Sequence, residues 1–522
     1  MIQKGLTGIM VFLFIGVNIV SAFNVDLSNT TMPMNRGDTL YVGGSGPGNY
    51  TTIQSAINAA SDGDTVFVYD DSSPYREHVI INKIITLIGE DKNTTVIDGR
   101  YSGTTVKISA NEVVLAGFTI QGGIGEGAGI SIESNGNEIF DNIIKNNGAG
   151  LEFQYGIYLG PYSDNVIRNN DIIYNKFGIE IYDLSKKGNN NLITGNFIAH
   201  NIETGIFDRD QDGGTTATWN VIADNGDPDY YWYHQCGVHK YGAYTIFHHN
   251  DFFFNYAQVQ LQARHHSSIW DDGSEGNFWD DWEQNPGYPD TYIIYNGPQG
   301  PKEIDYHPSA TPYNNRPVVG LSPKHYFAPV GEPIYFTADT SVDPDAVSWH
   351  WDFGDGTTSD EAYPTHPYNS SGFYRISVTI TDTQGRSDTS YSDARIGIAP
   401  NTPTITGPTK VKVGTLNNYT IVTTDPDDDF VLYYIMYAQP PWHTDFTVGP
   451  YKSGEEAIVG TRWDIRGGTT IWVKAIDGSG LESDYATLDV TIPRTHSFNS
   501  LFMKFFERFP RAFPILRHLL YL

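Results

Sequence analysis

The segment Asn170-Asp-Ile-Ile-Tyr-Asn175-Lys-Phe-Gly178-Ile179-Glu-Ile181 holds the sequence unit that decides the fold of this 522-residue chain. The unit has two Asn residues five positions apart, together with a Gly-Ile-x-Ile element. Alternation of apolar and polar residues over so short an element is typical of a strand with one buried face. The unit therefore predicts two short strands separated by a polar turn.

This unit recurs between about residues 100 and 283, and the first Asn of each pair follows the previous one by 24 to 30 positions. The Gly-Ile element recurs at Gly129-Ile130, Gly156-Ile157, Gly178-Ile179, Gly205-Ile206 and Gly237-Val238. The Asn pairs are Asn142/Asn147, Asn170/Asn175, Asn196/Asn201, Asn220/Asn225 and Asn250/Asn255. Such a repeat predicts a right-handed parallel β-helix in which stacked Asn side chains hydrogen-bond along the axis.

Separate sequence patterns mark the beginning and the end of the repeat region. Apolar residues at helical spacing between Tyr50 and Ala60 predict a short amphipathic helix that covers the open N-terminal end of the β-helix. The repeats close with Gly276-Asn-Phe-Trp-Asp-Asp-Trp282 and Asp305-Tyr-His-Pro308. On these residues, region 38–315 resembles the NosD-type β-helix proteins, part of a group of carbohydrate-binding and sugar-hydrolase β-helices. The resemblance implies a β-helix and, as a metal, copper.

Two sandwich modules are expected after the repeats. Region 318–398 contains Trp349-His-Trp-Asp-Phe-Gly-Asp-Gly-Thr357 and resembles a PKD domain, an immunoglobulin-like β-sandwich. Region 399–493, with Asp425-Pro-Asp-Asp-Asp429, looks like a second immunoglobulin- or fibronectin-like sandwich. Modules of this kind usually space, display or bind. The predicted fold class is thus all-β, a parallel β-helix followed by two sandwiches and a short amphipathic C-terminal tail.

Charge and cysteine content exclude some classes of function. The formal net charge is −29, which disfavours nucleic acid as a partner because phosphate binding needs a basic surface. A single cysteine, Cys236, excludes an intrachain disulfide and any cysteine-rich metal site.

Both termini suggest a protein outside the cytoplasm. Residues 1–22 have the form of a secretory signal peptide, with Lys4, an apolar run and a small-residue cleavage site. Residues 494–522 are basic and aromatic and resemble tails of archaeal secreted repeat proteins. We expect this tail to sort the protein or attach it to a membrane surface or cell envelope, or else to pack on the last sandwich. The predicted location is secreted or at the cell surface.

An acidic loop is the first candidate site. Asp208-Arg-Asp-Gln-Asp-Gly-Gly214 places carboxylates at Asp208, Asp210 and Asp212, and alternating carboxylates before Gly are typical of calcium loops. A solvated acidic turn without metal is the alternative.

Outward side chains on successive turns form the second candidate site. Aligning the repeats predicts one outward column of Ser131, Tyr158, Glu180, Phe207, His239 and Gln260, and another of Phe140, Arg168, Thr194, Thr218 and His248. Neighbouring strands lie about 4.8 Å apart, so these side chains predict a polar face together with Asp208, Arg209, Lys240 and Arg264. Its histidines suit Cu(II) or zinc, or they belong to an aromatic surface that binds no metal.

Aromatic side chains are the third candidate. They offer flat apolar faces for sugar rings, or they pack over the C-terminal end of the β-helix. The residues are Trp219, Tyr230, Tyr231, Trp232, Tyr233, Trp270, Trp279 and Trp282.

The preferred function is a modular secreted or surface protein whose β-helix binds a polysaccharide or surface glycan through Arg209, Trp232, His239 and His248. One alternative is a polysaccharide lyase or glycoside hydrolase that uses Asp208, Asp210 and Asp212 with Arg209 or Lys240. Pectinase-type Asn-Thr-Asp, Gly-His-Gly and Arg-Ile-Lys motifs are absent from the sequence, so catalysis is not the preferred reading. A further alternative is a metal-binding accessory protein of NosD type.

Overall fold

The computed structural model describes residues 37–124, 127–148, 154–182, 190–209, 213–227, 235–241, 244–261, 268–295, 302–321, 323–342, 347–439, 442–464, 466–493 and 508. The predicted signal peptide, and the tail apart from Arg508, lie outside these residues. Within them, no helix is long and apolar enough to cross a membrane.

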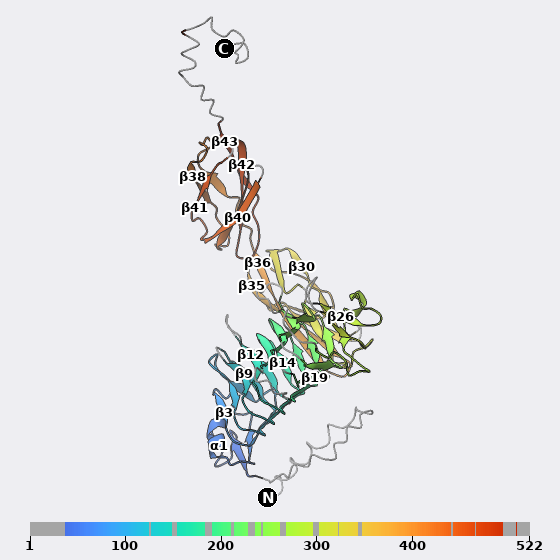
Figure 1. The fold of residues 1–522 in the computed structure, drawn as a ribbon. Coiled ribbons are helices and arrows are strands. Elements are labelled where there is room, and N and C mark those ends of the chain that lie inside the picture. The colour runs from blue at the N-terminus through green and yellow to red at the C-terminus, as the bar shows by residue number, and fades with distance from the viewer. Residues whose placement is uncertain are drawn as a thin grey trace.

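Three parallel sheets run along the β-helix, and the strands within each sheet come from successive turns (Figure 1). The first sheet contains β1 (Thr39–Val42), β2 (Thr65–Val68), β4 (Thr86–Gly89), β7 (Val114–Ala116), β10 (Glu138–Phe140), β13 (Val166–Arg168), β16 (Leu192–Thr194), β19 (Thr216–Thr218) and β22 (Ile246–His248). The second contains β5 (Val96–Asp98), β8 (Thr119–Gln121), β11 (Ile143–Lys145), β14 (Asp171–Ile173), β17 (Phe197–Ala199), β20 (Val221–Ala223), β23 (Asp251–Phe253) and β25 (Phe278–Trp279). The third contains β3 (Val79–Ile81), β6 (Val106–Ile108), β9 (Ala128–Ile132), β12 (Tyr155–Leu159), β15 (Phe177–Ile181), β18 (Thr204–Asp208), β21 (Cys236–Lys240) and β24 (Val259–Leu261).

Buried aliphatic residues stack from turn to turn inside the β-helix. In the third sheet Ile157, Ile179, Ile206 and Val238 pair in register and are fully buried. Burial of a side chain of this size contributes about 1.5–3 kcal/mol. The predicted β-helix and the inward direction of these side chains are therefore confirmed.

The predicted Asn ladders are present and buried. One column contains Asn142, Asn170, Asn196, Asn220, Asn250 and Asn277, a second contains Asn147, Asn175, Asn201, Asn225 and Asn255, and a third, which was not predicted, contains Asn137, Asn165 and Asn191. The side chain of Asn196 donates to the Ile167 carbonyl at 2.8 Å and to Asn220 Oδ1 at 3.0 Å. Asn220 Oδ1 also accepts the backbone N–H of Asn196 at 3.0 Å.

Both ends of the β-helix are covered. The predicted helix is α1 (Ile53–Ala59), which buries Ile53 and Ile57, and the Glu77 carboxylate accepts the N–H groups of Ile53 and Gln54 at its N-terminus. At the other end lie the 3₁₀ helix η1 (Trp282–Gln284) and the hairpin of β26 (Tyr292–Tyr295) and β27 (Lys302–Asp305). Asp305 Oδ2 ends the longest ladder by accepting the N–H of Asn277 at 2.8 Å.

Two β-sandwiches follow, as predicted (Figure 1). The first contains β28 (Val319–Leu321), β29 (His325–Pro329), β30 (Pro333–Tyr335), β31 (Ala338–Thr340), β32 (Val347–Asp352), β33 (Thr358–Ser359), β34 (Thr365–Pro367), β35 (Gly372–Asp382) and β36 (Ser387–Gly397). The second contains β37 (Thr404–Thr406), β38 (Leu416–Val422), β39 (Val431–Gln439), β40 (Trp442–Tyr451), β41 (Ala457–Arg462), β42 (Gly467–Ile476) and β43 (Ala486–Ile492). Trp351 and Trp463 are fully buried, one in each core.

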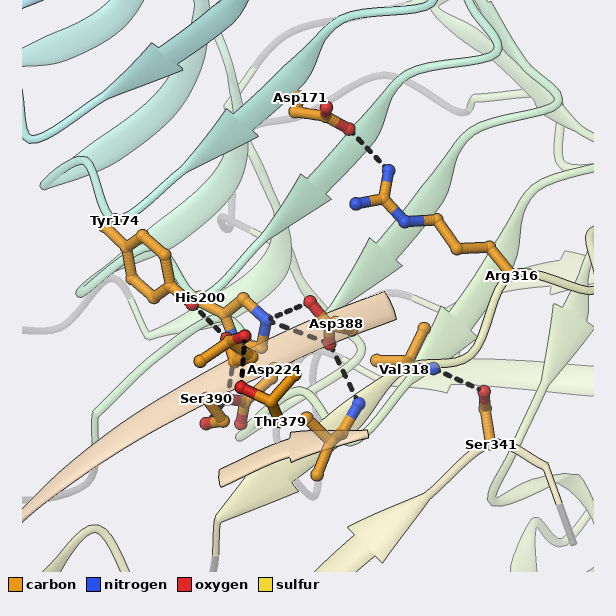
Figure 2. A network of polar contacts seen from close by, with 12 residues as sticks. Asp171, Tyr174, His200, Asp224, Arg316, Val318, Ser341, Thr379, Asp388 and Ser390 are labelled. Atoms are coloured by element: carbon orange, nitrogen blue, oxygen red, sulfur yellow. Dashed lines mark hydrogen bonds and ion pairs between the residues drawn. The ribbon is translucent and has the colours of Figure 1, made fainter. Parts of the chain in front are cut away.

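The first sandwich is docked on the second sheet of the β-helix. Val318 joins an apolar patch built from Phe197, Val221 and Phe253 on β17, β20 and β23. Beside this patch lies a buried polar network (Figure 2).

His200 is the centre of this network. It contacts Asp224 Oδ2 through Nδ1 at 2.8 Å and both carboxylate oxygens of Asp388, on β36, through Nε2 at 3.2 Å. Asp224 also pairs with Lys324 of the sandwich, and Asp388 Oδ2 accepts the Val319 N–H at 2.9 Å. Burial alone would lower the pKa of His200, but the two carboxylates outweigh it and raise the pKa to about 9. The imidazole is therefore a cation held between anions at neutral pH.

Replacing Asn196 by Leu tests the ladder. We expect the free energy of unfolding to fall by about 1–3 kcal/mol, because ladder partners lose their hydrogen bonds inside the protein. Chemical denaturation measures the change, and Asn58→Leu, at an exposed position of α1, is the control. An unchanged midpoint for Asn196→Leu would contradict a structural role of the ladder.

The His200 network predicts a pH dependence. Because the pKa of His200 is raised from 6.5 to about 9 on folding, its contribution is complete below about pH 6.5 and is lost as the pH rises through 9. The loss amounts to up to about 3 kcal/mol. The melting temperature should be measured between pH 7 and pH 10. It should fall more over this range for the parent than for the His200→Gln variant. Identical pH profiles for the two proteins would show that His200 is not charged in the folded protein.

Candidate functional site

A groove of about 700 Å³ lies on the outer face of the third sheet. It is lined by Thr104, Gly127, Ala128, Ser131, Glu133, Tyr155, Tyr158, Glu180, Tyr182 and Arg209. The predicted outward column supplies three of these, because Ser131, Tyr158 and Glu180 pair in register on β9, β12 and β15. The alternation of the strands therefore brings polar side chains from separate turns into one hollow.

Glu180 and Arg209 form the charged centre of the groove. Arg209 Nη1 lies 3.0 Å from Glu180 Oε1, and the guanidinium lies 4.9 Å from the centre of the Tyr182 ring. Glu180 is only 1% exposed, and this burial raises the pKa of its carboxyl although Tyr155 and Arg209 hydrogen-bond to it. The Arg209 side chain is 36% exposed, so it can meet a ligand from solvent.

Tyrosines form the walls. The rings of Tyr155 and Tyr158 lie 6.0 Å apart, and Tyr158 lies 6.1 Å from Tyr182. Burial, with the nearby Glu180 charge, raises the pKa of Tyr158 to about 12, so its hydroxyl stays protonated at neutral pH. On the opposite side Glu133 accepts from Ser131 Oγ at 3.2 Å and pairs with Lys107 at 2.7 Å. The groove thus combines aromatic faces with hydroxyl donors and paired charges.

His239 is not part of an open face. It occupies the predicted column between Phe207 and Gln260, yet it is 0% exposed and packs edge-on against Phe207 at 5.2 Å and flat on Tyr241 at 5.1 Å. The expected exposure of His239 to solvent was wrong, because Phe207 on the adjacent strand and Tyr241, two residues further along the chain, pack against its ring.

Asp208 and Lys240 were also expected on the open polar face, and that placement was wrong. Both are 0% exposed, and Lys240 Nζ lies 2.6 Å from Asp208 Oδ2 on the neighbouring strand. Each neutralises the other's buried charge. Asp210 and Asp212 lie outside the described residues, so calcium binding by this loop stays a prediction.

His248 lies on the first sheet, in the second predicted column, so it does not share the groove with Arg209. Its Nδ1 lies 2.5 Å from Nδ1 of His249. One ring nitrogen of each His and a carboxylate oxygen of Asp272 are all within 4.8 Å of one another. Burial, followed by the charge of His249, lowers the pKa of His248, which favours the neutral imidazole that metals bind. Trp219 stacks on His249 at 4.3 Å. Two imidazole nitrogens and one carboxylate suit Cu(II) or zinc.

Three of the other predicted aromatic residues pack over the C-terminal end of the β-helix. Trp270 and Trp279 are 1% exposed and pack at the C-terminal end of the β-helix, where Trp279 stacks on Tyr292 at 4.1 Å. Trp282 is partly buried against the same core and donates to the Thr291 carbonyl. Trp232 lies outside the described residues.

Tyr155 and Tyr182 were not predicted as site residues. Tyr182 directly follows the Gly-Ile-x-Ile element that contains Glu180, and Tyr155 directly precedes the same element one turn earlier. Aligning these two elements would have placed both tyrosines near Glu180.

Family models match two parts of the chain. The model described as "Periplasmic copper-binding protein (NosD)" matches residues 35–284, and the PKD domain model matches residues 314–396. These matches agree with the β-helix and with the first sandwich.

Curated relatives match over short segments. A microbial collagenase of Vibrio alginolyticus is 50% identical over 58 residues, which is 11% of this chain and 7% of the relative. Collagenase ColA of Bacillus cereus is 30% identical over 128 residues, 24% of this chain and 13% of the relative. The chain thus spans only a small part of these relatives, and the matches cover PKD-like segments.

Solved structures resemble the sandwich modules. The PKD domain of an M14-like peptidase from a Thermoplasmatales archaeon is 44% identical, over 19% of this chain and 99% of that one, with a TM-score of 0.17. The fibronectin(III)-like modules of Clostridium thermocellum CbhA are 15% identical over 33% of this chain and 93% of theirs, with a TM-score of 0.25.

Proposed function

We propose that this chain, which joins a NosD-type β-helix to a PKD domain and a second sandwich, is an extracytoplasmic surface protein whose β-helix binds a carbohydrate. The groove around Glu180 and Arg209 is the observation that carries the proposal. The NosD and PKD matches support a location in the cell envelope or outside the cell.

The chemistry of the groove suits a sugar. Sugar rings present C–H faces that pack on aromatic rings, and Tyr155, Tyr158 and Tyr182 supply such rings around one hollow. Sugar hydroxyls need both donors and acceptors, which Arg209, Glu180 and the Tyr hydroxyls offer. The groove lies on the third sheet whereas the first sandwich covers the second, so docking of the sandwich leaves the groove open.

The double variant Tyr158→Ala/Arg209→Ala tests this function. Glycan-array binding followed by titration calorimetry on the best glycan should show affinity weakened at least about tenfold, because an aromatic face and a cationic donor are removed together. Arg168→Ala is the matched control, since Arg168 also pairs with a Glu, Glu138 at 2.6 Å, and lies over an aromatic ring, but on the first sheet. It should bind as the parent does.

Equal binding by the double variant and the parent would place the glycan elsewhere. A parent that binds no glycan but releases oligosaccharides from a polymer would replace this function by the lyase or hydrolase alternative.

A second candidate function is binding of Cu(II) or a similar metal ion at His248, His249 and Asp272. It is supported by the close approach of the two Nδ1 atoms and by the description of the matching NosD family. The backbone N–H of Glu275 and the hydroxyl of Ser274 donate hydrogen bonds to Asp272 and lower its pKa to about 2, so its carboxylate is charged at neutral pH. His248 and His249 would hold the ion and Asp272 would offset part of its charge.

Titration with Cu(II), followed by electron paramagnetic resonance, tests this second function. The parent should bind one ion with nitrogen ligands, and His248→Gln should lose that signal, since imidazole nitrogens are the main donors. His350→Gln, at an exposed position of the first sandwich, is the control and should behave as the parent. Absence of stoichiometric binding by the parent would exclude the copper function.

A further inference from the structure

The outer face of a sheet in the first sandwich carries exposed aromatic rings. This sheet has the strand order β29-β36-β35-β32-β33, and β35 and β36 lie between the β-helix and the second sandwich (Figure 1). Phe327, Arg395 and Phe373 pair in one row across β29, β36 and β35. Ala394 and Ile376 on the same strands are buried in the core, so the alternation of the strands turns this row outward. Phe327 is 49% exposed and Phe373 is 65% exposed.

Arg375 supplies a cation beside this row. Its guanidinium lies 4.7 Å from the centre of the Tyr391 ring, and Tyr391 meets Tyr174 of the β-helix edge-on at 5.2 Å. Asp393 lies directly opposite Arg375 on β36, but its carboxylate contacts His325 at 2.9 Å. Within the described part of the chain, Arg375 forms no salt bridge. The β-helix therefore helps to hold Tyr391, and Tyr391 positions a guanidinium whose N–H groups remain available to a ligand.

Phe373 lines two hollows. One, of about 300 Å³, is lined from the β-helix by Asp227 and from the first sandwich by Arg375 and Tyr391. The other, of about 410 Å³, is lined by Arg395 of the first sandwich and by Asp427 and other residues of the second. Because the Phe373 ring belongs to both linings, a chain-like ligand can pass from one hollow to the other over this ring. All three modules of the chain contribute to its path.

Hydrogen-bond donors and acceptors lie beside the ring in both hollows. Arg375 and Arg395 present N–H donors, one in each hollow, and the Arg395 side chain is 43% exposed. Carboxylates of Asp227 and Asp393 line the first hollow, and that of Asp427 lines the second. A carboxylate accepts more than one hydrogen bond, but it repels an anion. The lining therefore favours an uncharged ligand that is rich in hydroxyl groups.

We propose that the two hollows on either side of Phe373 bind an uncharged oligosaccharide, as a second carbohydrate site that is independent of the β-helix groove. The C–H face of one sugar unit packs on the Phe373 ring. Its hydroxyls, and those of the neighbouring units, bond to Arg375 in one hollow and to Arg395 in the other, and they donate to the carboxylates. A bound oligosaccharide touches the second sandwich as well as the first, so it restrains the connection between them.

The test removes the β-helix groove first, so that the two sites are measured separately. In the full-length Tyr158→Ala/Arg209→Ala background, an array of uncharged oligosaccharides should still show binding, and titration calorimetry gives the affinity for the best one. Adding Phe373→Ala/Arg375→Ala should weaken this affinity at least about tenfold, since a stacking ring and a donor are lost together. Adding Tyr335→Ala instead should leave it unchanged, because Tyr335 is a 73% exposed ring of the same sandwich that lines neither hollow.

The outcomes for the two sites are distinguishable. Absence of binding in the background variant, or equal binding after the Phe373→Ala/Arg375→Ala and Tyr335→Ala changes, would overturn the second site. If the background variant binds as tightly as the parent and the Phe373→Ala/Arg375→Ala change abolishes binding, the second site stands and the groove is not a glycan site. Sedimentation velocity should give one monomeric species for every variant. A parent dimer that Phe373→Ala/Arg375→Ala dissociates would overturn the proposal by making this face an interface between copies.

Two further measurements test the path across both hollows. In the background variant, affinity should rise at least about tenfold from the monosaccharide to the trisaccharide of the same sugar, because successive units occupy the two hollows. Equal affinities would overturn the two-hollow path. The trisaccharide should also slow limited proteolysis near residues 398–403, between the sandwiches, in the background variant but not after Phe373→Ala/Arg375→Ala. Cleavage that the trisaccharide leaves unchanged in the background variant would contradict contact with both sandwiches.

Discussion

The hydrogen bond from one ladder Asn to the next is the interaction on which the rest of this structure depends. Each ladder Asn except Asn277 follows a residue in the left-handed conformation, and these residues include Tyr174, His200, Trp219, Asp224 and His249. That conformation costs a residue other than Gly roughly 1–2 kcal/mol, and the buried Asn bonds offset the cost at every turn. Because the Asn points inward, the residue before it is turned to the outside.

This geometry explains why chemically useful side chains gather in columns. Tyr174, His200 and Asp224 precede successive Asn residues of one ladder, and together they form the surface on which the first sandwich docks. Trp219 and His249 precede Asn residues of another ladder, and there they stack beside His248. A constraint that stabilises the fold therefore also arranges the interface and the candidate metal cluster.

Buried charged side chains have different kinds of partner in different parts of the chain. Asp208 and Lys240 form a closed pair, and His200 and Lys324 balance the charges of Asp224 and Asp388. In the groove, Glu180 is paired with an Arg209 that is still partly exposed. Asp477 in the second sandwich differs from these groups, because its Oδ2 atom is buried without a hydrogen-bond partner, and an unpaired buried carboxylate is far more costly than a paired one.

The sequence by itself determined the parallel β-helix, its ladders, the capping helix and the alternation of columns such as Tyr158 and Glu180, because each of these follows from a short repeat and from strand geometry. Only the tertiary structure decided which outward residues remain open. His239 lies in the predicted outward column, yet the rings of Phe207 and Tyr241 enclose it. Asp208 and Lys240 pair in register with the core residues Ile181 and Leu261, so they lie on the inward side of their strands and neutralise each other there. It also decided that Arg209, at the groove on the third sheet, and His248, on the first sheet, do not share one site. A repeat states which side of a strand a residue occupies, but exposure depends on neighbours that come from distant parts of the chain.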